Sequence, residues 1–80
     1  MNLDEIKKKL TQVFRDVFDD NSIELVRETT AADIEDWDSL SHITIIVAIE
    51  REFQIKLNLA DIKPLRNVGE MLDLIQRKIS

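Results

Sequence analysis

Cysteine is absent from the 80-residue chain, and glycine, proline and tryptophan each occur only once. Without cysteine there is no disulfide framework, no cysteine-based metal site and no thiol nucleophile. Any thiol chemistry must therefore come from a group that the chain does not itself encode. With one glycine and one proline, the sequence also lacks the turn residues that hairpins and β-sandwiches need. These absences favour an all-α fold.

Charge and length narrow the possible functions. Eleven Lys and Arg residues against sixteen Asp and Glu residues give a formal net charge of −5, a sign that repels nucleic acid and anionic lipid. We therefore expect no nucleic-acid binding, and protein partners of basic character. A chain of 80 residues is too short to hold both a deep catalytic cleft and a thick core around it, so we expect no enzyme.

Hydrophobic residues are plentiful but never form a long run. A hydrophobic fraction of 44% is enough for a folded core, yet no stretch approaches the roughly 20 apolar residues of a membrane-spanning helix. The opening residues MNLDEIKKKL lack the apolar run of a signal peptide. We expect a monomeric, cytoplasmic protein with no membrane span, folded as a single domain over residues 1–80.

The spacing of apolar residues predicts three long helices and one short helix. Apolar side chains recur at three- and four-residue intervals in each long segment, which is the period of a helix with one buried face. Asn67 and Glu70 are suited to cap the last helix. The expected fold is a small four-helix bundle. Its helices cover residues 3–18, 39–53 and 68–79, with a short third helix that begins at Asn58 and ends near Pro64.

The segment between the first two long helices is unusually long for a compact helical domain. Residues 19–38 are weakly periodic, and a connection of this length is more often functional than idle. Its apolar side chains are candidate anchors that would pin it across the bundle. They are Ile23, Leu25, Val26, Ala31, Ile34 and Trp37. We interpret Trp37 as a packing anchor, with a contact to a partner as the alternative.

The stretch DWDSLSH, residues 36–42, marks the start of the second long helix. If Asp38 is the N-cap, its carboxylate accepts hydrogen bonds from backbone N–H groups of the first turn. Ser39 then stands at the first helical position with its hydroxyl near solvent. The free N–H groups and the dipole at this end of a helix favour an anion, so the position suits a phosphorylated serine. Simple capping is the alternative.

A three-residue motif and the residues after it carry a resemblance that covers essentially the whole chain. Asp38-Ser39-Leu40 resembles a D-S-L attachment motif, and apolar residues follow it at Ile43, Ile46, Ile49 and Phe53. The tail EREFQIKLNLADIKPLRNVGEMLDLI is similar to a pattern of an acidic helix end, a short third helix and a capped fourth helix. Together these features resemble the acyl carrier proteins of the phosphopantetheine-binding family.

The resemblance implies that Ser39, flanked by Asp38 and Leu40, is the attachment point of 4′-phosphopantetheine. A separate phosphopantetheinyl transferase would take this group from coenzyme A, which makes the chain a phosphoprotein. The protein would tether acyl groups as thioesters on the arm. It would present them to acyl-loading and acyl-using enzymes of fatty-acid, polyketide or other specialised biosynthesis. An aminoacyl or peptidyl carrier and an unmodified helical adaptor are the alternatives.

The second long helix is expected to have two different faces. At about 100° per residue, Ile43, Ile46, Ile49 and Phe53 gather on one side, where Glu50 must reach the rim or find a partner. The opposite, largely uncharged side is the expected partner-binding face. It consists of Leu40, Ser41, Thr44, Val47, Ala48 and Arg51. In the family that the chain resembles, many fatty-acid carriers have acidic residues at some of these positions. Because this chain has no acidic residue there, we expect docking by burial more than by charge.

Two other kinds of site are excluded. Asp38, Ser39 and His42 have the residue types of a hydrolase triad, but the serine and the histidine would be neighbours on one helical turn with no glycine-rich nucleophile elbow. We therefore expect no catalytic residue, and interpret His42 as a polar surface residue or a contact near a phosphate. The stretch DDNSIELVRETT lacks the glycine of an EF-hand loop, so we expect no metal site.

Overall fold

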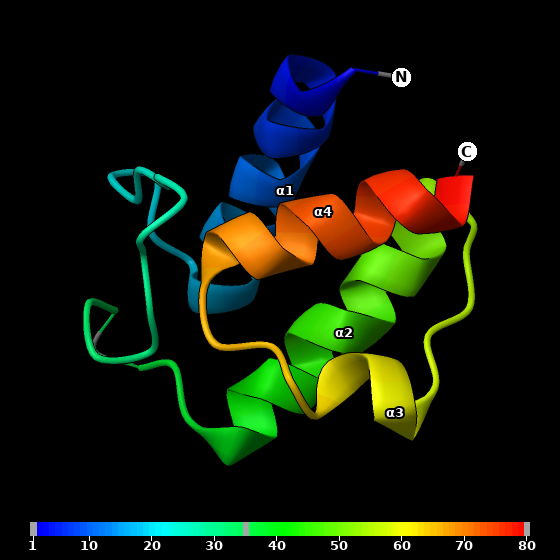
Figure 1. The fold of residues 1–80 in the computed structure, drawn as a ribbon. Helices are drawn as coiled ribbons and strands as arrows, with labels where there is room; N and C mark the ends of the chain where they lie inside the picture. The colour runs from blue at the N-terminus through cyan, green and yellow to red at the C-terminus, as the bar shows by residue number, and fades with distance from the viewer. Residues whose placement is uncertain (1, 35, 80) are drawn as a thin grey trace.

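Four helices account for the regular structure of the chain in a computed structural model, which describes residues 2–34 and 36–79. They are α1 (Leu3–Phe18), α2 (Ser39–Phe53), α3 (Leu59–Ile62) and α4 (Val68–Ile79), and Figure 1 shows α1, α2 and α4 crossing one another with α3 beside them. The described residues contain no β-strand. The prediction of an all-α bundle with three long helices and one short helix is confirmed.

Side-chain caps explain where the helices begin and end. The Oδ1 atom of Asn2 accepts a hydrogen bond from the N–H three residues further on, and Asn67 does the same for Glu70, each at 2.9 Å. These bonds satisfy N–H groups that have no partner inside a helix, and the expected cap of α4 is confirmed. After α1, Asp19 adopts a left-handed conformation with φ of 50°, and its N–H donates to the carbonyl oxygen of Arg15, which closes the helix.

The core lies where the apolar faces of α1, α2 and α4 meet, with α1 in contact with both of the other helices. Burying a whole aliphatic or aromatic side chain contributes about 1.5–3 kcal/mol relative to leaving it exposed, so this cluster is the main source of stability. Its members from the helices are Ile6, Leu10, Val13, Phe14, Ile45, Ile46, Ile49, Phe53, Val68, Met71, Leu72 and Ile75.

The buried face of α2 is rotated relative to the predicted one. Ile46, Ile49 and Phe53 are buried as expected, but Ile43 is 62% exposed and Ile45 is fully buried. The prediction that Ile43 faces the core is therefore wrong. Apolar side chains cover most of the circumference of α2, so the helical period alone does not tell which arc meets the other helices.

The connection from α2 to α4 is held by polar contacts. The N–H of Leu57 donates to the Oε2 atom of Glu50 at 2.9 Å, which gives that carboxylate the partner that its place beside the core requires. Asn58 caps α3, as expected, by accepting a hydrogen bond from the N–H of Asp61 at 2.9 Å. The carboxylate of Asp61 in turn lies 3.0 Å from the ammonium group of Lys78. This ion pair joins α3 to the end of α4.

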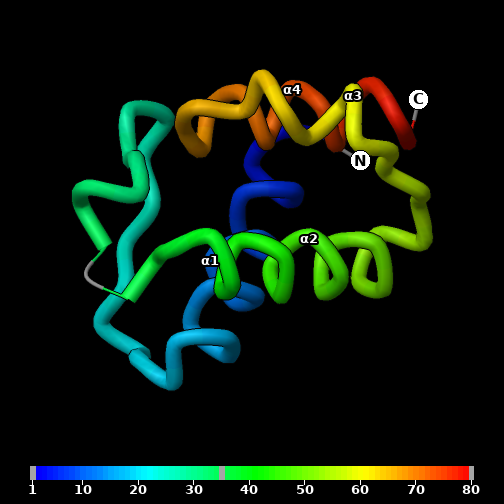
Figure 2. Tube along the Cα trace, turned by 90° about the horizontal axis from the view of Figure 1, so that it is seen from below, coloured from blue at the N-terminus to red at the C-terminus, as the bar shows by residue number. Residues whose placement is uncertain are grey.

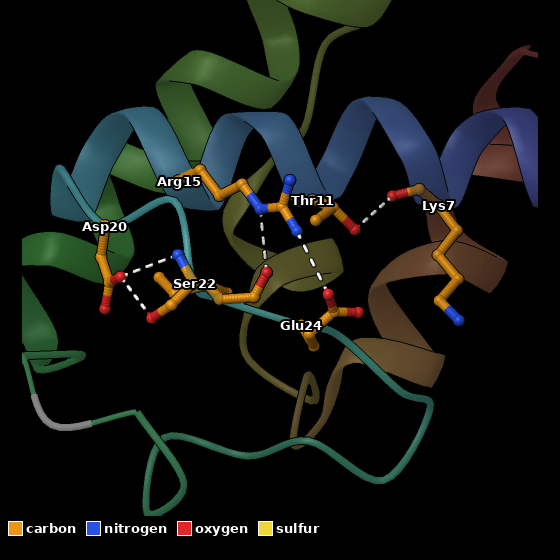
Figure 3. A network of polar contacts seen from close by, with 7 residues as sticks. Lys7, Thr11, Arg15, Asp20, Ser22 and Glu24 are labelled. Atoms are coloured by element: carbon orange, nitrogen blue, oxygen red, sulfur yellow. Dashed lines mark hydrogen bonds and ion pairs between the residues drawn. The ribbon is translucent and has the colours of Figure 1, made fainter.

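Polar contacts hold the first part of the 19–38 loop against α1, as Figure 3 shows. The Nε–H of Arg15 donates to the carbonyl oxygen of Ile23 at 2.9 Å, and the guanidinium lies 3.5 Å from the carboxylate of Glu24. Asp20 accepts a hydrogen bond from the N–H of Ser22 at 2.9 Å, which closes the turn after the helix. The chain is thereby turned back along α1.

The middle of the loop is bonded to the start of α4, and Figure 2 shows the loop on one side of the bundle. The N–H groups of Val68 and Gly69 donate to the carbonyl oxygens of Thr29 and Arg27, each at 2.9 Å. Loop carbonyls thus accept from N–H groups that the first turn of α4 leaves free. A Cβ atom on Gly69 would lie 3.1 Å from the Cβ and carbonyl oxygen of Arg27, so glycine suits this close approach. The Arg27 guanidinium also pairs with Asp73 at 2.8 Å.

The predicted anchors of the loop are confirmed in part. Ile23, Leu25 and Trp37 are buried, and Ile34 packs partly buried against the core. The prediction is wrong for Val26, which is 52% exposed, and for Ala31, which is also exposed. Residues 23–26 belong to no helix, and their burial alternates, with Ile23 and Leu25 buried and Glu24 and Val26 exposed. This is the alternation of side chains along an extended chain.

Trp37 is packed as an anchor at the end of the loop. Its indole is 8% exposed and meets the ring of Phe14 from α1 edge to face, with ring centroids 5.1 Å apart and an interplanar angle of 86°. Aromatic pairs in this arrangement add about 0.5–1.5 kcal/mol beyond the area they bury. The residue that precedes Asp38 is therefore tied to the core, which places the start of α2 firmly.

Candidate functional site

The start of α2 is organised by Asp38, which is its N-cap. The Oδ1 atom of Asp38 accepts hydrogen bonds from the N–H groups of Leu40 at 3.0 Å and Ser41 at 2.9 Å, and the Ser41 hydroxyl accepts from the N–H of Asp38 at 2.8 Å. These bonds, chiefly those from Ser41, lower the pKa of the Asp38 carboxyl below its ordinary value of 3.8. The cap is therefore ionised at neutral pH and already has its partners.

Ser39 is the first residue of α2, and its side chain is exposed. Its hydroxyl makes no hydrogen bond to any other residue that the structure describes. The two nearby serines thus differ in role, because the hydroxyl of Ser41 completes the cap while that of Ser39 faces solvent. Leu40 beside it is 75% exposed. The structure places Asp38, Ser39 and Leu40 together at one exposed corner, as the sequence predicts.

A cleft of about 430 Å³ opens beside Ser39. It lies between the start of α2 and the connection that leads into α4. Part of its wall is apolar, and Arg66 adds a positive charge. The lining residues are Ala31, Trp37, Asp38, Ser39, His42, Leu65, Arg66, Asn67 and Met71. Leu65, Arg66 and Met71 were not predictable as site residues, because they join Ser39 only through the packing of α4 and carry no local motif of their own.

His42 lines the same cleft and is partly buried against Trp37. The indole Nε1–H donates to Nδ1 of the imidazole at 3.1 Å, and the two rings stack with centroids 5.9 Å apart and an interplanar angle of 22°. Burial lowers the pKa of His42. Since Nδ1 accepts from an indole and Asp38 bonds to backbone N–H groups, the structure brings Asp38, Ser39 and His42 close without forming a catalytic triad.

The outward side of α2 carries several exposed apolar residues. Leu40 and Val47 are exposed as predicted, together with Thr44 and Arg51, whereas Ser41 and Ala48 are half-buried. Ile43 joins this face. A shallow groove of about 490 Å³ between α1 and α2 continues it, with Asp16, Arg51 and Glu52 among its residues. We call Leu40, Ile43, Thr44, Val47 and Arg51 the outer face of α2.

Among residues 2–34 and 36–79, no group of three or more His, Cys, Asp or Glu side chains is placed to hold a metal ion. In the same part of the chain, no helix has both the length and the apolar character needed to cross a membrane.

Comparisons with known proteins identify the family of the chain. A family model described as a phosphopantetheine attachment site matches residues 8–75. An acyl carrier protein of Thermosynechococcus vestitus is 29% identical over 80 residues, which cover this whole chain and 99% of that protein. The solution NMR structure of a holo acyl carrier protein from Geobacter metallireducens is 49% identical, with a TM-score of 0.86, over 91% of this chain and 84% of that one. The family match spans the start of α2, the cleft and most of the core, and the chain therefore belongs to the phosphopantetheine-attachment family.

Proposed function

We propose that the protein is an acyl carrier whose 4′-phosphopantetheine arm is attached to Ser39. Membership of the phosphopantetheine-attachment family supports a carrier with a covalent arm and not a catalyst. The observation that carries the assignment to Ser39 is its exposed hydroxyl at the first position of α2, without a hydrogen-bond partner among the described residues and next to a cleft. When bound, the arm supplies the thiol that holds the acyl group, in a chain without cysteine.

The residues around Ser39 fit a phosphodiester. The start of a helix favours negative charge through its free N–H groups and its dipole. The cap carboxylate of Asp38 already accepts from two N–H groups of the first turn, which compensates part of its own charge. Arg66 contributes a positive charge to the adjacent cleft. The same cleft offers Leu65 and Met71 as apolar surface, which suits the uncharged part of an arm.

The outer face of α2 is the proposed docking surface for the phosphopantetheinyl transferase and for the acyl-loading and acyl-using enzymes. Leu40 is 75% exposed, Ile43 62% and Val47 44%, so three apolar side chains stand next to one another without a cover. Apolar residues gathered in this way are typical of contact surfaces. Because Arg51 is the one charged side chain among the five residues of this face, partners dock by burial more than by charge. This suits a carrier dedicated to a specialised acyl pathway.

Transfer of an acyl group onto the loaded protein tests the proposal. The protein is first incubated with coenzyme A and a broad-specificity phosphopantetheinyl transferase, and then with ATP, fatty acids of several chain lengths and an enzyme that acylates carrier proteins. We expect the intact mass to rise by one arm and then by one acyl chain. Unloaded protein should gain no acyl chain. Loading of amino acids by an amino-acid-activating enzyme, with no gain from any fatty acid, would contradict the acyl assignment.

A further inference from the structure

The one histidine and the one tryptophan of the chain are in contact at the cleft beside Ser39. An indole N–H is a donor only, so the nitrogen that receives it must carry a lone pair. Nδ1 of His42 is therefore unprotonated. In a neutral imidazole the remaining proton is then on Nε2. Trp37 thus selects one tautomer of His42 out of two.

The Nε2–H of His42 is a donor without a partner in the described part of the chain. His42 follows Ser39 by three positions in α2, and residues with this spacing are neighbours on a helix surface. Helical side chains lean towards the N-terminus, so the imidazole lies over the turn that begins at Ser39. Both residues line the same cleft. A group attached to the Ser39 hydroxyl would therefore be close to this donor.

The cleft holds two charged groups besides the imidazole, the carboxylate of Asp38 and the guanidinium of Arg66. Asp38, on the same helix, has its Oδ1 atom bonded to the N–H groups of Leu40 and Ser41. Arg66, from the connection into α4, is the other charged residue of the cleft, and a guanidinium donates without accepting. The remaining lining residues around His42 are uncharged. The Asp38 carboxylate forms no hydrogen bond with the imidazole among the described residues, so the Nε2–H can donate to an anionic oxygen that a group on Ser39 would bring.

We propose that the Nε2–H of His42 donates a hydrogen bond to a phosphodiester oxygen of the arm on Ser39, and that Trp37 is the positioning residue that holds His42 in the required tautomer. This inference rests on the proposed attachment at Ser39. It gives the pair a role in placing the arm at the mouth of the cleft. It also links the arm to the core, because the same indole packs on Phe14.

Loading of the arm should change how His42 titrates. A negative charge near an imidazole favours its protonated form, so loading the arm should raise the pKa of His42. A doubly protonated ring has no lone pair, so protonation also removes the acceptor of the Trp37 N–H. Loading should therefore raise the pH at which acidification changes the environment of Trp37. With one histidine and one tryptophan, each signal has a single source.

The test follows the side-chain ¹⁵N resonances of His42 by NMR against pH, in unloaded and loaded protein, with loading confirmed by intact mass. In unloaded protein we expect the ¹⁵N pattern of the Nε2–H tautomer. In loaded protein we expect the titration midpoint to move upward by roughly half a pH unit, the effect of one negative charge about 5 Å away in a watery surrounding. The ³¹P resonance of the phosphodiester should show an inflection at the same midpoint.

Variants separate positioning from packing. Trp37→Phe keeps an aromatic ring against Phe14 but removes the donor to Nδ1, so His42 should show a mixture of tautomers and the ¹⁵N and ³¹P changes on loading should shrink. Lys63→Gln, at an exposed position of the connection into α4 that does not line the cleft, is the matched control and should keep both the tautomer and the inflection. The comparison of unloaded and loaded wild type needs no variant, so it stands even where Trp37→Phe folds poorly.

Each outcome decides a different claim. Loaded protein in which the midpoint and ¹⁵N pattern of His42 equal those of unloaded protein would overturn the proposed hydrogen bond while leaving Ser39 as the attachment site. An Nδ1–H tautomer in unloaded wild type would overturn the role of Trp37. Failure of the mass to rise at all would overturn the attachment itself, and the inference with it.

Discussion

The two faces of α2 are built from the same kinds of residue but differ in exposure. Ile45, Ile46 and Ile49 face inward and are at most 5% exposed, whereas Ile43 and Val47 face outward and are 62% and 44% exposed. Side-chain chemistry does not distinguish these faces. What differs is that α1 and α4 cover one of them, and no element among the described residues covers the other. The same apolar character stabilises the fold on one side and is available to partners on the other.

Ser39 stands where the two faces meet at the first turn. Leu40 next to it belongs to the outer face, while His42 turns towards the cleft and Trp37. A partner on the outer face would therefore meet the proposed attachment site at Leu40, which does not line the cleft. The comparison predicts that inward substitutions reduce stability, that outward ones reduce docking, and that each leaves the other property nearly unchanged.

The largest effect is expected from shortening an inward side chain. Ile49→Ala removes methyl groups from a fully packed core and should lower the free energy of unfolding by about 2–5 kcal/mol, measured by urea denaturation. Val47→Ala, two positions earlier on the outer face, is the matched control and should change it by about 0.5 kcal/mol or less. Equal losses in the free energy of unfolding for the two variants would show that the outer face is packed against the fold and not available to partners.

A smaller effect is expected on docking. Ile43→Asn removes an apolar contact from the outer face and should lower kcat/KM of the phosphopantetheinyl transferase by about tenfold, equivalent to about 1.4 kcal/mol, while unfolding stays nearly unchanged. The control is Val26→Asn, because Val26 is also an exposed apolar residue but lies in the 19–38 loop. Comparable loss of transferase activity in both variants would remove the special role of the outer face.

The third prediction concerns whether apolar burial or charge contributes more to docking. If partners dock mainly by burial, Thr44→Glu should reduce partner turnover by placing a charge within the apolar contact, and Arg51→Glu at the edge should have the milder effect. Raising the ionic strength should change turnover of the wild type by about twofold or less. Unchanged turnover in Thr44→Glu together with abolished turnover in Arg51→Glu would show that charge, not burial, controls docking.

The smallest effect concerns pH and the inward side of the first turn. Burial lowers the pKa of His42 below its ordinary 6.5, and hydrogen bonds lower the pKa of Asp38 below 3.8. In both cases the unfolded chain binds more protons, so unfolding becomes easier as pH falls, first below about 6.5 and again below about 3.8. His42→Gln should flatten the first step in denaturation curves and keep the second. Stability that rises on acidification from about pH 7 to about pH 5 would contradict the burial of His42.

Residues with strong local patterns were predictable from the sequence. The single-sided apolar spacing of α1 gives its bounds, and the Asp38–Ser39 pair marks the start of α2 because a capping carboxylate acts over a few neighbouring residues. The inward arc of α2 was not predictable, because apolar residues surround it and only contact with other helices decides between Ile43 and Ile45.

Contacts between distant segments were also outside the reach of local patterns. The hydrogen bond from Val68 to Thr29 and the place of Arg66 in the cleft depend on how α4 packs against the 19–38 loop. The pairing of Trp37 with His42 spans only five positions, yet it needs the loop end to be pinned on Phe14 before the rings can stack. Tertiary packing, and not propensity, completes the site.

The most direct measurement of the central claim compares two serines in the same helical turn. Wild type, Ser39→Ala and Ser41→Ala are each incubated with coenzyme A and a phosphopantetheinyl transferase, and their intact masses are determined. We expect wild type and Ser41→Ala to gain one phosphopantetheine each, and Ser39→Ala to gain none. The Ser39→Ala variant should remain folded, because the hydroxyl that it removes has no part in the cap. A gain in Ser39→Ala that is lost in Ser41→Ala would contradict the assignment of the arm to Ser39.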